Sequence, residues 1–155
     1  MTVIRVETKI EAPPALCFDL ARSIELHIAS TGRTKEWAIA GVTSGLIGAG
    51  QEVTWSARHF GVRQTLTSRI TVFDPPHHFR DSMVRGAFAR FDHDHHFEGH
   101  DRGTRMLDLF DYAAPLGPLG RLAERLVLDR YLRHLLVERA RVIKTVAESE
   151  RSALR

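Results

Sequence analysis

The segment that follows Gly120 constrains the fold of this chain most strongly, because it contains no Gly or Pro from residue 121 to Ser149. Its apolar residues recur at a spacing near 3.6, which predicts one long amphipathic helix. They are Leu122, Leu126, Leu128, Tyr131, Leu132, Leu135, Leu136, Val142, Ile143 and Val146. A slip in this phase around Asp129 and Arg130 indicates a kink. A helix with such a stripe must cover another apolar surface, which the rest of the chain has to supply.

The residues before this segment are divided by glycines and prolines into short apolar stretches, as in an antiparallel sheet. Residues 2–11 alternate with a period near 2, which predicts a first strand. Further strands are predicted at residues 37–46, 52–60, 62–73, 79–84, 88–98 and 104–113. The links between them are short, so we expect neighbours in sequence to pair as a meander.

Two short helices are predicted between the first and second strands. Pro13 and Pro14 end the first strand and suit the first turn of a helix, and Ser23 suits the N-cap of a second helix over residues 24–30. The resulting order of strand, two short helices, about six strands and one long helix is an α+β fold. A chain of 155 residues forms one domain, expected at residues 1–149 and followed by a C-terminal tail at 150–155.

The composition excludes several classes of protein. A single cysteine, Cys17, rules out an intramolecular disulfide and a cysteine-based zinc site, and its apolar neighbours predict a buried thiol. No apolar run approaches about 18 residues, and the first residues lack a secretory pattern. We therefore expect a cytoplasmic protein without stable membrane insertion.

The net charge of +3 hides an uneven distribution, because residues 119–155 hold nine basic and five acidic side chains. Charges alternating on the solvent side of the long helix account for this excess. Nucleic-acid binding is not expected, since Tyr131 is the only aromatic residue after Tyr112. A docking surface for a protein partner or an anionic membrane, with Arg130 and Arg133, stays an alternative.

The predicted strand at 88–98 contains the most unusual motif of the chain. One of its faces carries charged residues and should meet water, whereas the other carries Phe91, His93, His95 and Phe97. The matching face of the following strand carries Met106, Asp108, Phe110 and Tyr112. Two histidines are therefore expected among aromatic residues on the covered side of the sheet.

The register between these two strands has two alternatives. Pairing the apolar faces places His95 opposite Asp108 and His93 opposite Phe110. A three-residue turn with a bulge would instead bring His93 near Asp111. In both cases a carboxylate reaches a histidine on the inner face.

Three interpretations of this His/Asp group follow. It can line a cavity and orient a ligand through hydrogen bonds, or His95 and Asp108 can act as a general acid–base pair. It can also bind a metal, because same-face strand residues lie about 6.5 Å apart, but the register leaves the third ligand undetermined. We expect the first arrangement, with no metal and no cofactor.

The order of elements and several motifs resemble the START-like helix-grip superfamily, the SRPBCC proteins that include polyketide cyclases/dehydrases and lipid-transport proteins. The resemblance covers essentially the whole chain. The chain is similar in particular to the small, uncharacterised bacterial ligand-binding members. It rests on Ala12-Pro13, Thr43-Ser44-Gly45-Leu46, Glu52-Val53-Thr54-Trp55, Ile70, the segments 75–81, 93–97, 103–108, 112–117 and 119–126, and Arg130-Tyr131-Leu132. It implies a curved antiparallel sheet of about seven strands wrapped around the long C-terminal helix, with a deep cavity between them.

This resemblance and the inner-face pattern together predict a binding module for a small hydrophobic or amphipathic molecule, such as a lipid, a polyketide or an aromatic compound. The alternative is a cyclase or dehydratase that uses His95 and Asp108 on a carbonyl substrate. The predicted ligand-binding residues are Trp55, Phe91, His93, His95, Phe97, Met106, Asp108, Phe110, Tyr112, Leu132 and Leu136. Homodimer formation stays open, and the identity of the ligand is not encoded in any motif.

Overall fold

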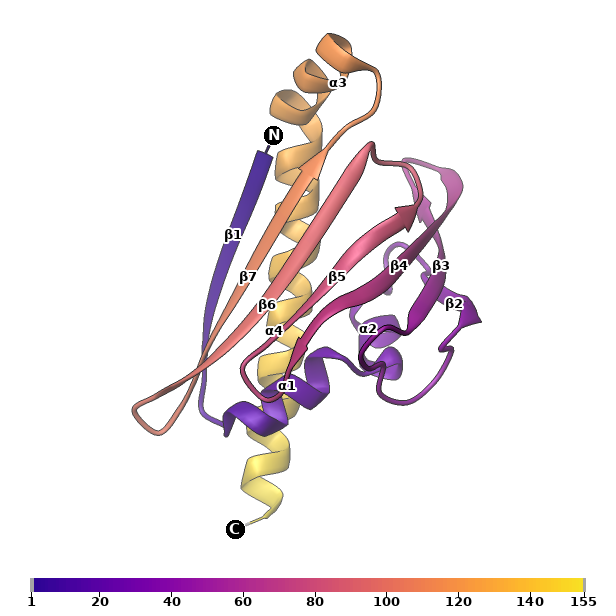
Figure 1. The fold of residues 1–155 in the computed structure, drawn as a ribbon. Helices are drawn as coiled ribbons and strands as arrows, with labels where there is room; N and C mark the ends of the chain where they lie inside the picture. The colour runs from indigo at the N-terminus through magenta and orange to yellow at the C-terminus, as the bar shows by residue number, and fades with distance from the viewer. Residues whose placement is uncertain (1, 155) are drawn as a thin grey trace.

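The computed structural model of the chain describes residues 2–154 and contains one seven-stranded antiparallel sheet. The strand order is β1-β7-β6-β5-β4-β3-β2, so consecutive strands from β2 to β7 pair as a meander and β1 closes onto β7 (Figure 1). The strands are β1 (Thr2–Ile10), β2 (Trp37–Gly41), β3 (Glu52–His59), β4 (Val62–Asp74), β5 (His78–Arg85), β6 (Arg90–His100) and β7 (Gly103–Ala113). The predicted α+β helix-grip architecture is confirmed.

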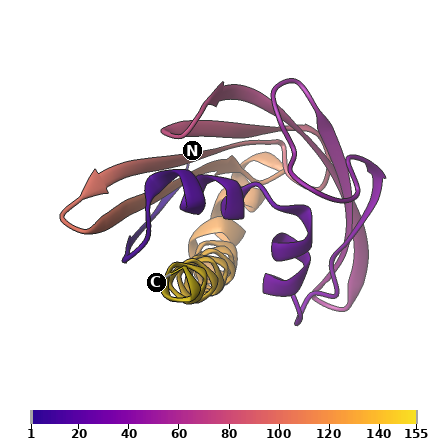
Figure 2. The ribbon, with the colours of Figure 1, turned by 90° about the horizontal axis from the view of Figure 1, so that it is seen from below.

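The sheet curves strongly around the C-terminal helix, as the view along that helix shows (Figure 2). Bulges contribute to this curvature, because the extra residue bends the strand that carries it. The pairing of β4 with β5 shifts twice, between Thr67 and Ser68 and between Ile70 and Val72. β2 is shorter than predicted and ends at Gly41, whose φ of +73° turns the chain out of the strand.

Two short helices, α1 (Pro14–Ala21) and α2 (Ile24–Ser30), follow β1 as predicted. Ser23 caps α2, since its hydroxyl accepts a 3.2 Å hydrogen bond from the backbone N–H of Leu26. Phe18 of α1 packs edge-on against Phe79 and Phe97, with ring centroids 5.4 and 5.5 Å apart. These aromatic contacts hold α1 against one end of the sheet.

The long C-terminal helical segment consists of α3 (Gly117–Ala123), a single π-helical turn (η1, Glu124–Leu128) and α4 (Asp129–Ala153). A π turn inserts one extra residue into the helical repeat. The apolar phase therefore slips directly after η1, which is where the sequence pattern slips. α4 continues through Glu150 to Ala153, into the segment expected to be a tail, because none of these residues breaks a helix.

α4 packs against the sheet differently along its length. Near its C-terminal end the buried residues Ala140, Ile143 and Ala147 are small or β-branched, so the helix axis can approach the sheet closely. Near its N-terminal end the helix carries the larger Leu132 and Leu136, which contact the core but are only partly buried. The interior is consequently solid at one end of α4 and hollow at the other.

Candidate functional site

A cavity of about 420 Å³ lies between the concave face of the sheet and the N-terminal half of α4. Its floor comes from the inner faces of β3 to β7, including Val53, Trp55 and Ala57. Its roof comes from Leu132, Leu136 and neighbouring residues of α4, while α2 closes one side. This volume lies within the range of roughly 300–1,000 Å³ found for small-molecule sites.

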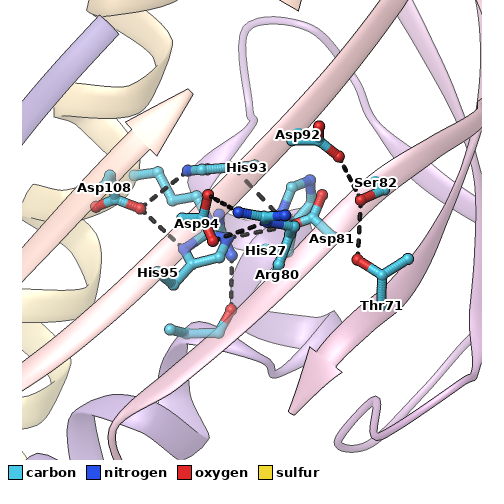
Figure 3. A network of polar contacts seen from close by, with 12 residues as sticks. His27, Thr71, Arg80, Asp81, Ser82, Asp92, His93, Asp94, His95 and Asp108 are labelled. Atoms are coloured by element: carbon cyan, nitrogen blue, oxygen red, sulfur yellow. Dashed lines mark hydrogen bonds and ion pairs between the residues drawn. The ribbon is translucent and has the colours of Figure 1, made fainter. Parts of the chain in front are cut away.

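Four polar side chains form a compact group at the floor of this cavity (Figure 3). His95 bridges two carboxylates, with its Nδ1 2.9 Å from Asp108 Oδ1 and its Nε2 3.0 Å from Asp81 Oδ2. His93 Nε2 lies 3.0 Å from the same Asp108 oxygen. The strand register is the first of the two alternatives, with His95 opposite Asp108 and His93 opposite Phe110.

The ionisation of this group follows from burial and hydrogen bonding together. Burial raises the pKa of Asp81, but the hydrogen bond from His95 and the nearby imidazole of His93 outweigh it and lower the pKa to about 2. For Asp108, the hydrogen bonds from His93 and His95 likewise overcome burial and lower its pKa well below the usual range. Both carboxyl groups are therefore ionised at neutral pH.

The pKa values of the two histidines shift in opposite directions. Burial lowers the pKa of His93, and the neighbouring His95 lowers it further. Burial also acts to lower the pKa of His95, but hydrogen bonds to Asp108 and Asp81 raise it above the ordinary value. His95 accordingly carries the positive charge of the group and donates from both ring nitrogens, whereas His93 is neutral.

This charge pattern leaves one ring nitrogen free. His93 donates from Nε2 to Asp108, so its Nδ1 carries a lone pair, and that nitrogen lies 3.9 Å from Asp81 Oδ2. Asp81 and His93 border the cavity, whereas His95 and Asp108 lie behind them. This His/Asp group thus presents two hydrogen-bond acceptors to the cavity.

The structure divides the predicted ligand-binding residues into two sets. Six of them border the cavity: Trp55, Phe91, His93, Phe110, Leu132 and Leu136. Five are buried in the core outside its lining: Phe97, Met106, Tyr112, His95 and Asp108. Alternation along a strand selects one face of the sheet, but the cavity underlies only the part of that face from which α4 stands away.

Asp81 is the most important residue that the sequence reasoning missed. It lies on β5, directly opposite His93 in the strand register, and follows the buried Phe79 by two positions. The same alternation that placed the histidines inside would have placed Asp81 beside them. Its neighbours His78, Arg80 and Ser82 are polar as well, which concealed the inward position.

A second polar group lines the cavity near α2, and its His27–Glu36 pair was also missed. His27 Nε2 lies 2.9 Å from Glu36 Oε1, and the His27 ring stacks on Trp55 with centroids 4.1 Å apart. Nearby, His59 Nδ1 lies 2.7 Å from the hydroxyl of Tyr131. Burial raises the pKa of Glu36, but the charge and hydrogen bond of His27 outweigh it, so the pKa is lowered.

Two sets of three side chains bring potential metal-ligand atoms within 4.8 Å of one another, and they lie on opposite faces of the sheet. The inner set is Asp81, His93 and His95, and the outer set is His78, Asp94 and His96. In the outer set Arg80 donates to both oxygens of Asp94, at 2.9 and 3.0 Å. The outer carboxylate therefore already has a cationic partner.

The sequence model of the family described as polyketide cyclase/dehydrase and lipid transport matches residues 10–136. The chain belongs to this family. The predicted membership of the helix-grip superfamily is thereby confirmed. A search of the curated proteins finds no match to this chain.

Solved structures agree with this membership at the level of the fold. The Zhui aromatase/cyclase from Streptomyces sp. R1128 superposes with a TM-score of 0.75 at 15% identity, over 95% of this chain and 93% of that one. The protein TTHA0849 from Thermus thermophilus gives 0.73 at 20% identity, over 94% and 99%. Major latex-like protein 151 from Panax ginseng gives 0.64 at 14% identity, over 94% and 97%.

Within residues 2–154, no helix is both long enough and apolar enough to cross a lipid bilayer. α4 has the necessary length, but charged side chains interrupt its apolar stripe.

Proposed function

We propose that the chain binds a small, largely apolar molecule in the cavity between the sheet and α4. The cavity itself carries this proposal, since its volume suits a small molecule and most of its lining is apolar or aromatic. Burial of apolar ligand surface would supply the driving force, at about 25 cal/mol per Å². Membership of a family of cyclases, dehydrases and lipid-transport proteins supports the same function.

The polar groups of the cavity restrict the chemistry of the ligand. Asp81 and the Nδ1 of His93 are both acceptors at the cavity floor, so the ligand group that meets them carries a donor such as an alcohol or phenol. A ligand carboxylate placed beside Asp81 would be repelled by that ionised side chain, whereas Arg22 and Arg139 elsewhere in the lining carry positive charge. Glu36 and His59 near α2 offer polar contacts for a second functional group.

Native mass spectrometry of freshly purified protein tests the proposal directly, because a retained ligand appears as an added mass. A fluorescent apolar probe then measures affinity for the wild type and two variants. Ala57→Trp places an indole in the cavity, and we expect it to weaken probe binding at least tenfold. Arg58→Trp adds the same group to the exposed face of β3 and serves as the control. Equal probe affinity in the two variants would contradict the cavity as the binding site.

A catalytic role is the second candidate, and the orientation of His93 favours it. Asp108 holds Nε2 of His93 at 3.0 Å and leaves Nδ1 toward the cavity, which is the arrangement of an oriented general base. We assign this role to His93 rather than to the predicted His95, since both ring nitrogens of His95 already donate to carboxylates. The reaction type would be proton abstraction next to a carbonyl, as cyclisation or dehydration requires.

Exchange of the methylene protons of a 1,3-diketone into D₂O, followed by NMR, measures this step without knowledge of the natural substrate. We expect His93→Gln to slow protein-dependent exchange by about 100-fold or more while probe binding persists. His78→Gln on the outer face is the matched control and should leave the rate unchanged. Exchange no faster with wild-type protein than without it would reject the catalytic role.

A further inference from the structure

Three side chains that can ligate a metal meet at the floor of the cavity: Asp81, His93 and His95. Each offers a ligand atom within 4.8 Å of those of the other two. Asp81 Oδ2 is 3.0 Å from Nε2 of His95 and 3.9 Å from Nδ1 of His93. Nitrogen and oxygen ligands about 2.0–2.2 Å from one transition-metal ion lie roughly 3–3.5 Å from each other. The separations of 3.0 and 3.9 Å between these ligand atoms come close to that range.

A single carboxylate, that of Asp108, determines which ring nitrogens of His93 and His95 face Asp81. Its Oδ1 accepts hydrogen bonds from Nε2 of His93 at 3.0 Å and from Nδ1 of His95 at 2.9 Å. Imidazoles that bind a metal through one nitrogen commonly donate from the other to a carboxylate, which orients the ring. Here one buried carboxylate orients both rings at once, and their remaining nitrogens are the ones that lie near Asp81.

The charge of the group also favours a cation. The carboxylates of Asp81 and Asp108 lie within ion-pair distance of the same two imidazoles, so two acidic side chains meet beside the cavity. Among residues 2–154, neither Asp81 nor Asp108 forms an ion pair with an Arg or a Lys. Arg139 lies nearby but donates instead to the carbonyl of Ala21 at 2.6 Å.

We propose that Asp81, His93 and His95 bind a divalent transition-metal ion at the cavity floor, with Asp108 as the carboxylate that orients both imidazoles. Two imidazoles and one carboxylate suit Zn²⁺, Co²⁺ or Fe²⁺ better than Ca²⁺ or Mg²⁺, which prefer oxygen ligands. Three protein ligands leave at least one coordination position for water or for an oxygen atom of a molecule in the cavity.

The outer set of His78, Asp94 and His96 provides a control within the same two strands. It contains the same residue types, and its ligand atoms also lie within 4.8 Å of one another. Its carboxylate, however, receives both the guanidinium of Arg80 and Nε2 of His78. A metal at the outer set would have to compete with Arg80, so we expect binding at the inner set alone.

The experiment uses the full chain treated with a chelator, titrated with Zn²⁺ in a calorimeter and with Co²⁺ by visible absorption, without any other ligand. We expect one ion per chain and a Co²⁺ spectrum with nitrogen and oxygen ligands. Asp81→Asn and His93→Gln should each weaken binding by at least tenfold. Both residues border the cavity, so these variants disturb the core less than changes at His95.

His78→Gln should bind Zn²⁺ and Co²⁺ like the wild type. The proposal is overturned if the wild type shows no saturable binding, if His78→Gln abolishes binding, or if all four proteins bind equally. Because the titration contains no organic ligand, the metal site can fail while the proposed ligand-binding function stands. Loss of probe binding in Ala57→Trp tests that function separately.

Discussion

The two faces of β5 and β6 carry the same residue types, but their side chains are placed in different surroundings. On the outer face, Asp94 is shared between His78 and Arg80, and the Arg80 side chain is 39% exposed. On the inner face, His95 and Asp108 are 1% and 7% exposed and make ion pairs with each other and with their His and Asp neighbours. The outer carboxylate is paired with an arginine in contact with water, whereas the inner carboxylates make their direct ion pairs with histidines. The partner of the carboxylate therefore distinguishes the two faces: a half-exposed arginine on the outer face and buried histidines on the inner face.

Removal of one carboxylate from each face should give the largest difference in the free energy of unfolding between the two faces. Asp108→Asn leaves the His95 imidazolium with one carboxylate partner fewer in a buried position, and we expect a loss of about 3–5 kcal/mol in the free energy of unfolding. Asp94→Asn on the outer face should cost about 1–2 kcal/mol, because water can solvate its former partners. Urea unfolding of both variants measures the difference, and equal losses would contradict the contrast between the faces.

The acid sensitivity of the inner group should be the next largest effect. The pKa of Asp81 is lowered to about 2 in the folded protein. The stability it contributes is therefore present above its unfolded pKa of about 3.9 and is lost as the pH falls towards 2. We expect the wild type to lose about 2 kcal/mol of this stabilisation between pH 5 and pH 2. The Asp81→Asn variant should not show this part of the loss.

Urea unfolding of wild-type and Asp81→Asn proteins across this pH range provides the measurement. The lowered pKa values of Asp108 and Asp94 make both proteins less stable in acid, so the informative quantity is the difference between their slopes. His95 acts with the opposite sign: its raised pKa contributes stability below about pH 6.5, which is lost as the pH rises through the folded value. Identical slopes for the two proteins would show that Asp81 is not held ionised by the histidines.

The smallest effect should come from the outer arginine. Arg80→Met removes an ion pair in contact with water, and we expect a cost of about 0.5 kcal/mol at low ionic strength. This cost should shrink in 1 M NaCl, where the Debye length is about 3 Å. Chemical unfolding at two salt concentrations measures it, with Asp108→Asn as the comparison whose cost salt should barely change. A salt-independent cost for Arg80→Met would indicate that packing of the side chain matters more than its charge.

The pattern of the sequence was sufficient to predict much of the fold. Period-2 alternation located the first strand, and glycines and prolines marked the limits of the others. The absence of Gly and Pro after Gly120 located the long helix. The phase slip near Asp129 marked the end of the π-helical turn, although the pattern alone did not identify its geometry. These features are local, since each depends on residues only a few positions apart.

The candidate site was predicted only in part, and Asp81 illustrates why. The row of His93 and His95 is visible within one strand, and Asp108 follows from pairing two adjacent apolar faces. Asp81 reaches this group through a different strand pair, and its polar neighbours on β5 obscure its direction. The His27 and Glu36 pair was invisible for a similar reason, because it joins a helix to a segment before β2.

The sequence by itself determined the order of the elements and the residues on the covered face of the sheet, and it left two alternative registers for the last two strands, of which the structure has the first. Only the tertiary structure decided which part of that face is hollow. That outcome depends on how closely α4 approaches the sheet, which is set by Ala140 and Ala147 at one end and by Leu132 and Leu136 at the other. The tertiary structure also decided that Asp81 of β5 lies beside the two histidines of β6. Such distances depend on packing between residues far apart in the chain, which no local periodicity records.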